Sequence, residues 1–233
     1  MASLGSTVGI FFGAQAVAAV VVGAGATAMH RNTNSVGVQF LFGALADGLV
    51  VAGVMLMLRW LRWHWTDIGL RVPKIRHLIF GLLAAVPYYI LYTLIVVTVT
   101  AVVPSLNVGE KQQLGFSSVH GALSMVLAFL SLVVFPPLAE EIAMRGFLYT
   151  GLKKWLPRFA AALLVSALFG AAHLTEGGAA GPLWIGAIDT FTLSLVLVFL
   201  REKTGNLWAG ILLHALKNAV AYVTLFVIGT HSV

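Results

Sequence analysis

The sequence contains no cysteine and few charged residues. The lack of cysteine excludes disulfide bridges, thiolate metal sites and a cysteine nucleophile. Charged residues make up 9% of the chain, whereas a soluble domain carries about 25%. Hydrophobic residues make up 60% of the 233 positions, and the mean hydropathy is +0.97. This balance excludes an ordinary soluble domain and predicts an integral membrane protein.

Long apolar runs predict an all-α, polytopic transmembrane bundle. Most of the runs are close to the roughly 20 residues that a bilayer core requires, although the fifth is short. The short connections leave room for one integral membrane domain over residues 1–233, of which 1–121 carries no signature and 122–233 holds the motifs described below. We expect seven spans, at residues 7–29, 37–58, 78–103, 122–139, 159–173, 183–200 and 207–229.

Basic residues beside the spans predict the orientation of the chain. Ten lie in connections on one side of the membrane, whereas only Arg31 and Lys111 lie on the other. Because short cytoplasmic loops are enriched in Lys and Arg, we expect the N-terminus in the cytoplasm and the C-terminus outside. The net charge of +6 is thereby explained without a nucleic-acid partner. The ten are Arg59, Arg62, Arg71, Lys74, Arg76, Lys153, Lys154, Arg158, Arg201 and Lys203.

The first apolar run has two interpretations. It ends in Ala26-Thr27-Ala28, which is similar to the cleavage site of a signal peptide. However, residues 1–7 contain no Lys or Arg, and the run is long for the apolar part of a signal peptide. We therefore expect an uncleaved first span.

Three ionisable residues follow the fourth apolar run: Glu140, Glu141 and Arg145. Each would cost roughly 2.5–3.5 kcal/mol at the centre of a spanning helix. In a helix, Glu141 and Arg145 form an i,i+4 pair in the favourable order, whereas Glu140 points about 100° away and lacks a local partner. A desolvated, unpaired carboxylate takes up a proton more readily, which suits a general base acting on water. The alternative is a solvated ion cluster at the cytoplasmic helix end, and these residues alone favour neither.

Two histidines and an amide lie in later apolar runs. His173 follows Phe169 by four residues, and His214 and Asn218 share one face of the seventh span. A single buried histidine is usually structural, but this set, together with Glu140, can deprotonate a water and stabilise an oxyanion. The chemistry predicted is water attack on an amide bond. In an alternative, His173, His214 and Glu140 bind Zn²⁺ and leave one coordination position open.

Three motifs occur in order across the C-terminal half: Glu-Glu-x-x-x-Arg at 140–145, Phe-x-x-x-His at 169–173 and His-x-x-x-Asn at 214–218. Together they resemble the CAAX-processing and bacteriocin-processing (CPBP) family of intramembrane proteases, which includes the type II CAAX prenyl endopeptidases. The turn at 204–208, before the last histidine, is similar to that family as well. The resemblance runs from Pro136 to the end of the seventh span.

The resemblance implies an active site inside the membrane, toward the cytoplasmic side. It implies that Glu140 activates the hydrolytic water with help from His173, and that His214 and Asn218 stabilise the oxyanion. Supporting roles are implied for Glu141, Arg145 and Phe169. The family is described both as metal-dependent and as a metal-free glutamate protease. Pairing of Glu141 with Arg145, which leaves Glu140 as the base, agrees with the metal-free description.

Two further features bear on the shape and polarity of the site. Val198 stands where the family tends to have a small residue, whereas Ser194 keeps one, so the shape of the peptide groove is expected to differ. Asp189 and Lys217 are unusual at membrane depth, and we expect them either to pair with each other or to line a polar cavity.

The function predicted is that of an intramembrane endopeptidase in a prokaryotic cell membrane. Its substrate would be a membrane-associated protein or peptide, cut at a CAAX-like end or a leader peptide. The alternative is a membrane immunity factor or scaffold that keeps the fold without proteolysis. A proton-coupled transporter is a third hypothesis, since Glu and His inside membranes also form proton relays. The three intact motifs favour the protease.

Overall fold

The computed structural model describes residues 2–116 and 119–228. Every regular element in these residues is helical, and seven helical stretches are long and apolar enough to cross a membrane. The predicted all-α bundle of seven spans is therefore confirmed; residue 229, the predicted end of the last span, lies outside the described residues. The seven stretches are Leu4–Ala28, Val36–Leu61, Ile75–Val102, Ala122–Leu152, Arg158–Ala179, Trp184–Thr204 and Trp208–Ile228.

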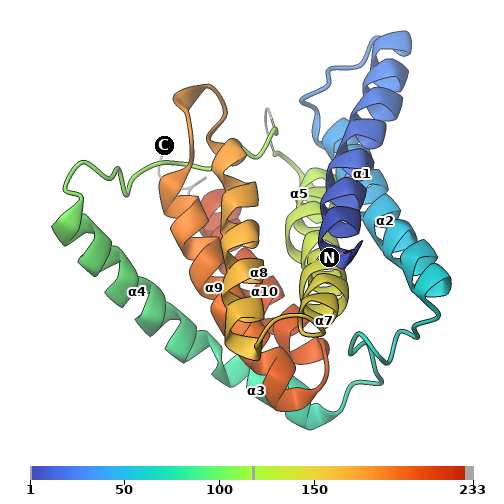
Figure 1. The fold of residues 1–233 in the computed structure, drawn as a ribbon. Helices are drawn as coiled ribbons and strands as arrows, with labels where there is room; N and C mark the ends of the chain where they lie inside the picture. The colour runs from blue at the N-terminus through green and yellow to red at the C-terminus, as the bar shows by residue number, and fades with distance from the viewer. Residues whose placement is uncertain (1, 117–118, 229–233) are drawn as a thin grey trace.

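The N-terminal helices pack against the C-terminal ones. Helices α1 (Ala2–Ala28) and α2 (Val36–Leu61) lie side by side, and both contact the fourth span (Figure 1). Helix α3 (Ile75–Leu83) packs on the last span, and α4 (Ala85–Val102) packs on the sixth. The spans without a recognisable motif thus form part of the packing that holds the C-terminal half in place.

The fourth span continues through the charged motif. The predicted end at residue 139 was wrong, because the helical stretch runs on to Leu152. It can do so because Glu141 and Arg145 form an ion pair inside it, so the chain need not leave an apolar environment at its first charge. The stretch consists of α5 (Ala122–Phe129), the π-helical η1 (Leu130–Val134), α6 (Phe135–Glu140), the π-helical η2 (Glu141–Leu148) and α7 (Tyr149–Leu152).

The last three spans each contribute to the wall of the cavity described below. The fifth was predicted to end at residue 173, but a 3₁₀ segment extends it further. The fifth span packs on the sixth, which a short turn joins to the seventh (Figure 1). The elements are α8 (Arg158–Ala172), the 3₁₀ segment η3 (His173–Ala180), α9 (Trp184–Thr204), α10 (Trp208–Tyr222) and the π-helical η4 (Val223–Ile228).

A small set of hydrogen bonds fixes the start of α10. The preceding turn reverses at Gly205, whose φ is +64°, a conformation that glycine adopts at little cost. The Leu207 amide donates to the Gly69 carbonyl at 2.9 Å, and the Trp208 indole N–H donates to the Arg71 carbonyl at 2.9 Å. The Asn206 side-chain amide contacts the same loop. The turn that is similar to the protease family therefore anchors the helix that carries His214.

Helices α8 and α9 approach each other closely at Gly170. A Cβ atom at this position would lie 2.7 Å from the Ala187 carbonyl oxygen and 3.1 Å from the Phe191 Cβ. The contact involves backbone, which cannot rotate away, so a side chain here would push the two helices apart.

We expect Gly170→Ala to lower the free energy of unfolding by about 1–3 kcal/mol, the usual cost of overpacking. Gly48→Ala is the matched control, because a Cβ there meets nothing within 4 Å and alanine favours helix. Tryptophan fluorescence during denaturation in mixed micelles would measure both. Equal stabilities for the two variants would contradict the close packing.

Candidate active site

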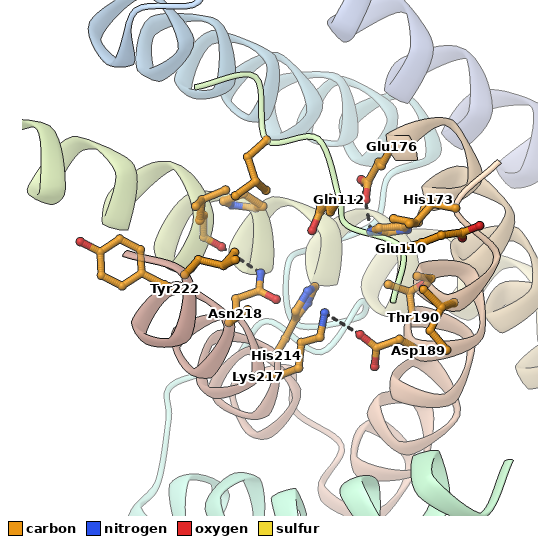
Figure 2. A pocket seen from close by; sticks show the side chains of 18 of the residues that line it. Glu110, Gln112, His173, Glu176, Asp189, Thr190, His214, Lys217, Asn218 and Tyr222 are labelled. Atoms are coloured by element: carbon orange, nitrogen blue, oxygen red, sulfur yellow. Dashed lines mark hydrogen bonds and ion pairs between the residues drawn. The ribbon is translucent and has the colours of Figure 1, made fainter. Parts of the chain in front are cut away.

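A cavity of about 470 Å³ lies at the centre of the C-terminal half (Figure 2). Its wall includes Glu140 from the fourth span, His173 from the fifth, and His214 and Asn218 from α10. These four residues come from three separate stretches of sequence, and they are the ones predicted to act in chemistry. The fold therefore brings the predicted set to one site. Further polar lining residues are Glu110, Gln112, Glu176, Asp189, Thr190 and Lys217.

The ion pair predicted between Glu141 and Arg145 lies behind the cavity wall. Arg145 Nη1 is 3.0 Å from Glu141 Oε1, and the two side chains are 0% and 1% exposed. The Arg145 guanidinium also lies 4.2 Å from the centre of the Phe169 ring. Room for the carboxylate comes from Gly210, where a Cβ would lie 2.9 Å from Glu141 Oε2. Each charge of this pair depends on the other, because neither reaches water.

Glu140 faces the cavity instead of the ion pair. Its Oε2 is buried and has no hydrogen-bond donor among the residues that the structure describes. The His214 ring faces this oxygen, and its Nε2 lies 3.7 Å from it. With Glu140 16% exposed and Glu141 1% exposed, the alternative of a solvated cluster at the helix end was wrong. Glu140 thus presents to the cavity a carboxylate oxygen that accepts no hydrogen bond from the described residues.

His173 is held in one tautomer. Its Nδ1 lies 2.7 Å from the Phe169 carbonyl oxygen, which can only accept a hydrogen bond. Nδ1 therefore carries the hydrogen, and in the neutral ring Nε2 keeps its lone pair. The Phe169 ring packs edge-on against the rings of His173 and His214, at centroid distances of 4.7 Å and 5.9 Å. The aromatic residue of the motif orients both histidines.

His214 lies between the two glutamates. Its Nδ1 is 3.5 Å from Glu141 Oε1, and its Nε2 is 3.7 Å from Glu140 Oε2. The carboxylate of Glu141 can only accept, so it favours a hydrogen on Nδ1. The buried ion pair thereby orients the imidazole that faces Glu140.

Asn218 completes the backbone hydrogen bonding of the fourth span. The Leu132 carbonyl would accept from residue 136 in an α-helix and from residue 137 in a π-helix, but Pro136 and Pro137 have no N–H. The Asn218 Nδ2 donates to this carbonyl at 2.8 Å. One N–H of the amide is therefore fixed on the fourth span, and the second remains available beside the cavity.

Sequence reasoning missed the contribution of Glu176 and the loop before α5. Glu176 Oε2 accepts from the Gln112 side-chain amide at 2.8 Å, and its carbonyl accepts from the Gln113 amide at 2.8 Å. Its Oε1 lies 3.8 Å from His173 Nε2. The spacing of three residues between His173 and Glu176 was the available signal. The loop has no such signal, because its contacts are far apart in sequence.

The arrangement does not fit the zinc alternative. His173 Nε2 lies 3.8 Å from Glu176, and His214 Nε2 lies 3.7 Å from Glu140, so the two ring nitrogens have different acidic neighbours. Within residues 2–116 and 119–228, no group of three or more His, Cys, Asp or Glu side chains is placed to hold a metal ion. The donor set of His173, His214 and Glu140 is thus not a zinc site in this geometry.

Comparison with known proteins agrees with the motifs. Residues 122–220 match the family model of type II CAAX prenyl endopeptidase Rce1-like proteins, and the resemblance predicted from sequence is confirmed. The match begins at α5, ends within α10 and contains all seven predicted site residues. No curated protein and no solved structure matches the chain.

Proposed function

We propose that this protein, whose residues 122–220 belong to the Rce1-like family of type II CAAX prenyl endopeptidases, is an intramembrane endopeptidase that uses a glutamate-activated water. The family is one of membrane-embedded proteases, and the seven apolar helices make the chain an integral membrane protein. The observation that carries the mechanism is the convergence of Glu140, His173, His214 and Asn218 on one cavity.

In this mechanism a water binds between the Glu140 carboxylate and the His173 Nε2 lone pair. Glu140 takes a proton from the water as its oxygen attacks the carbonyl carbon of the substrate. The resulting oxyanion accepts hydrogen bonds from the second N–H of Asn218 and from His214 in its imidazolium form, in which Nε2 also carries a hydrogen. When the tetrahedral intermediate collapses, the C–N bond breaks, and the proton passes from Glu140 to the leaving amine. The products are one new carboxylate and one new amine, so a single water is consumed.

The substrate we propose is a membrane-associated protein or peptide, cut at a CAAX-like end or a leader peptide. The excess of basic residues in one set of loops supports an N-terminus in the cytoplasm and a C-terminus outside, in a prokaryotic cell membrane. Contacts of α1 and α2 with the fourth span support a single membrane domain over residues 1–233.

Incubation of purified protein in detergent with a quenched peptide library, followed by mass spectrometry, tests this function. We expect fragment pairs whose summed mass equals the parent peptide plus one water. Cleavage should continue in the presence of a zinc chelator, because the geometry offers Glu140 and not a metal as the activator of water. Loss of cleavage on chelation with recovery on addition of zinc would contradict the metal-free mechanism. Absence of cleavage both in detergent and in lipid vesicles would contradict proteolysis.

A further inference from the structure

The cavity contains a positive charge that the proposed mechanism does not use. Lys217 lies on α10, three residues after His214 and directly before Asn218. Among the lining residues that the structure describes, it alone has a side chain with a fixed positive charge. Its Nζ lies 2.9 Å from Asp189 Oδ2, and Figure 2 shows the two side chains pointing toward each other across the cavity wall. The sequence predicted that Asp189 and Lys217 either pair with each other or line a polar cavity. In the structure they do both.

Lys217 has more hydrogen-bond donors than its ion pair with Asp189 occupies. An ammonium group has three N–H donors, and Asp189 is the one ion-pair partner of Lys217 found in the described residues. Asp189 is itself occupied at both oxygens, because its Oδ1 accepts from the Tyr88 hydroxyl. Asp189 is therefore held by two donors, while Lys217 keeps donors that face the cavity, with its side chain 19% exposed.

Burial of the ion pair between Lys217 and Asp189 has an energetic cost, and a contribution to stability does not explain why the pair is present. Replacement of a buried ion pair by apolar residues is often neutral or stabilising, and ionisable groups inside membranes mark substrate or ion pathways. Glu176 accepts from Gln112, whereas Glu140 Oε2 and Glu110 Oε2 are buried acceptors without a hydrogen-bond donor among the described residues. The spare donors of Lys217 are thus the unmatched positively charged donors of the described part of the wall.

We propose that Lys217 anchors a carboxylate of the substrate beside the scissile bond, with Asp189 holding the ammonium in position. This inference rests on the proposed function, since it assigns the substrate feature that the same cavity selects. Three residues of helix rise separate Lys217 from His214, about 4.5 Å, and an extended peptide advances about 3.3 Å per residue. The anchored carboxylate therefore lies within a few residues of the bond that is cut. It is supplied either by the C-terminus of the substrate or by an acidic side chain.

Binding to an inactive enzyme separates this anchor from catalysis. The probes are three fluorescein-labelled decapeptides of one Ala/Leu/Val sequence: one ends in a free carboxylate, one ends in a carboxamide, and one is a carboxamide with Glu at the penultimate position. Their affinities are measured by fluorescence anisotropy in detergent. All proteins carry Glu140→Gln, and three versions are compared: no further change, Asp189→Asn, and Asp189→Asn with Lys217→Met.

We expect the free acid to bind about 10-fold or more tightly than the carboxamide in the first two versions, because a charge-assisted hydrogen bond is lost in the amide. In the third version the two peptides should bind equally. The third version removes both charges at once, so it leaves no unpaired Asp189 to destabilise the protein. Elution volume and tryptophan fluorescence during unfolding confirm that each version is folded.

Each result bears on the anchor. Equal binding of acid and amide in the first version, no measurable binding of the acid, or an acid preference that survives Lys217→Met overturns it. A Glu-containing carboxamide that binds like the free acid supports it and identifies an acidic side chain as a sufficient source. Cleavage of the same peptides by the wild-type protein is the separate test of proteolysis. A preference for the free acid without cleavage would support the Lys217 anchor and contradict proteolysis. Cleavage without a preference for the free acid would support proteolysis and contradict the anchor.

Discussion

Substitution of Glu140 by glutamine should lower the turnover number for peptide cleavage by about 10²–10⁴-fold, the range contributed by a general base. Glutamine keeps the size and the hydrogen-bonding oxygen of the side chain but cannot accept the proton of the attacking water. Among the acids that the structure describes on the cavity wall, Glu140 is the one that faces His214, with its Oε2 3.7 Å from Nε2 of that ring. Cleavage of a quenched peptide by purified protein measures the effect.

Glu110→Gln is the matched control for this substitution. Glu110 is another carboxylate on the wall of the same cavity, but it has no part in the proposed chemistry, so turnover should stay close to that of the wild type. Both variants should be produced in equal yield. Unchanged turnover in Glu140→Gln would show that Glu140 is not the base. A biological effect that survives Glu140→Gln would favour the immunity-factor or scaffold hypothesis.

Substitution of Glu141 by glutamine should reduce the free energy of unfolding by about 3–5 kcal/mol, because it leaves a buried charge uncompensated. The charge in question is Arg145, whose side chain is 0% exposed and whose guanidinium lies 3.0 Å from Glu141. The same change replaces the carboxylate that lies 3.5 Å from His214 Nδ1 by a neutral amide, so turnover should fall together with stability. Denaturant titration in mixed micelles, followed by tryptophan fluorescence, measures the stability.

The double variant Glu141→Gln with Arg145→Met tests the reason for that loss. It removes both charges, so it should be more stable than Glu141→Gln alone, although it also loses the contact between Arg145 and Phe169. Glu141→Gln with the stability of the wild type would show that Arg145 has another source of compensation. A double variant less stable than Glu141→Gln alone would show that packing of Arg145 against Phe169 outweighs the charge.

The spacing of residues along the sequence was sufficient to predict much of this fold and part of the site. Each span is an apolar run of nearly the length that a bilayer requires, so the number of spans and most of their limits follow from hydropathy. The pairing of Glu141 with Arg145 follows from i,i+4 geometry and holds in the structure. The end of the fourth span was misplaced because hydropathy counts both charges of this pair, whereas the folded helix neutralises them.

Contacts between distant segments were not available from sequence. Asn218 donates to Leu132, which is 86 residues away, and no periodicity within either helix indicates that contact. The choice between a paired and a cavity-lining Asp189 also stayed open, because it depends on how α9 and α10 are rotated about their axes. Residues of the loop before α5 reach the cavity only through tertiary packing, as the bond between Gln112 and Glu176 illustrates.

The two consecutive prolines of the fourth span have a consequence for the order in which the molecule is assembled. The chain is synthesised from its N-terminus, so the Leu132 carbonyl enters the membrane before the segment that carries Asn218 exists. An unpaired carbonyl in hydrocarbon costs several kcal/mol, and this cost draws the last span toward the fourth. Docking of α10 satisfies the carbonyl and delivers His214 to Glu140 in the same event. A partly made chain therefore lacks half of the proposed site, and we expect proteolytic activity only after the final helix has docked.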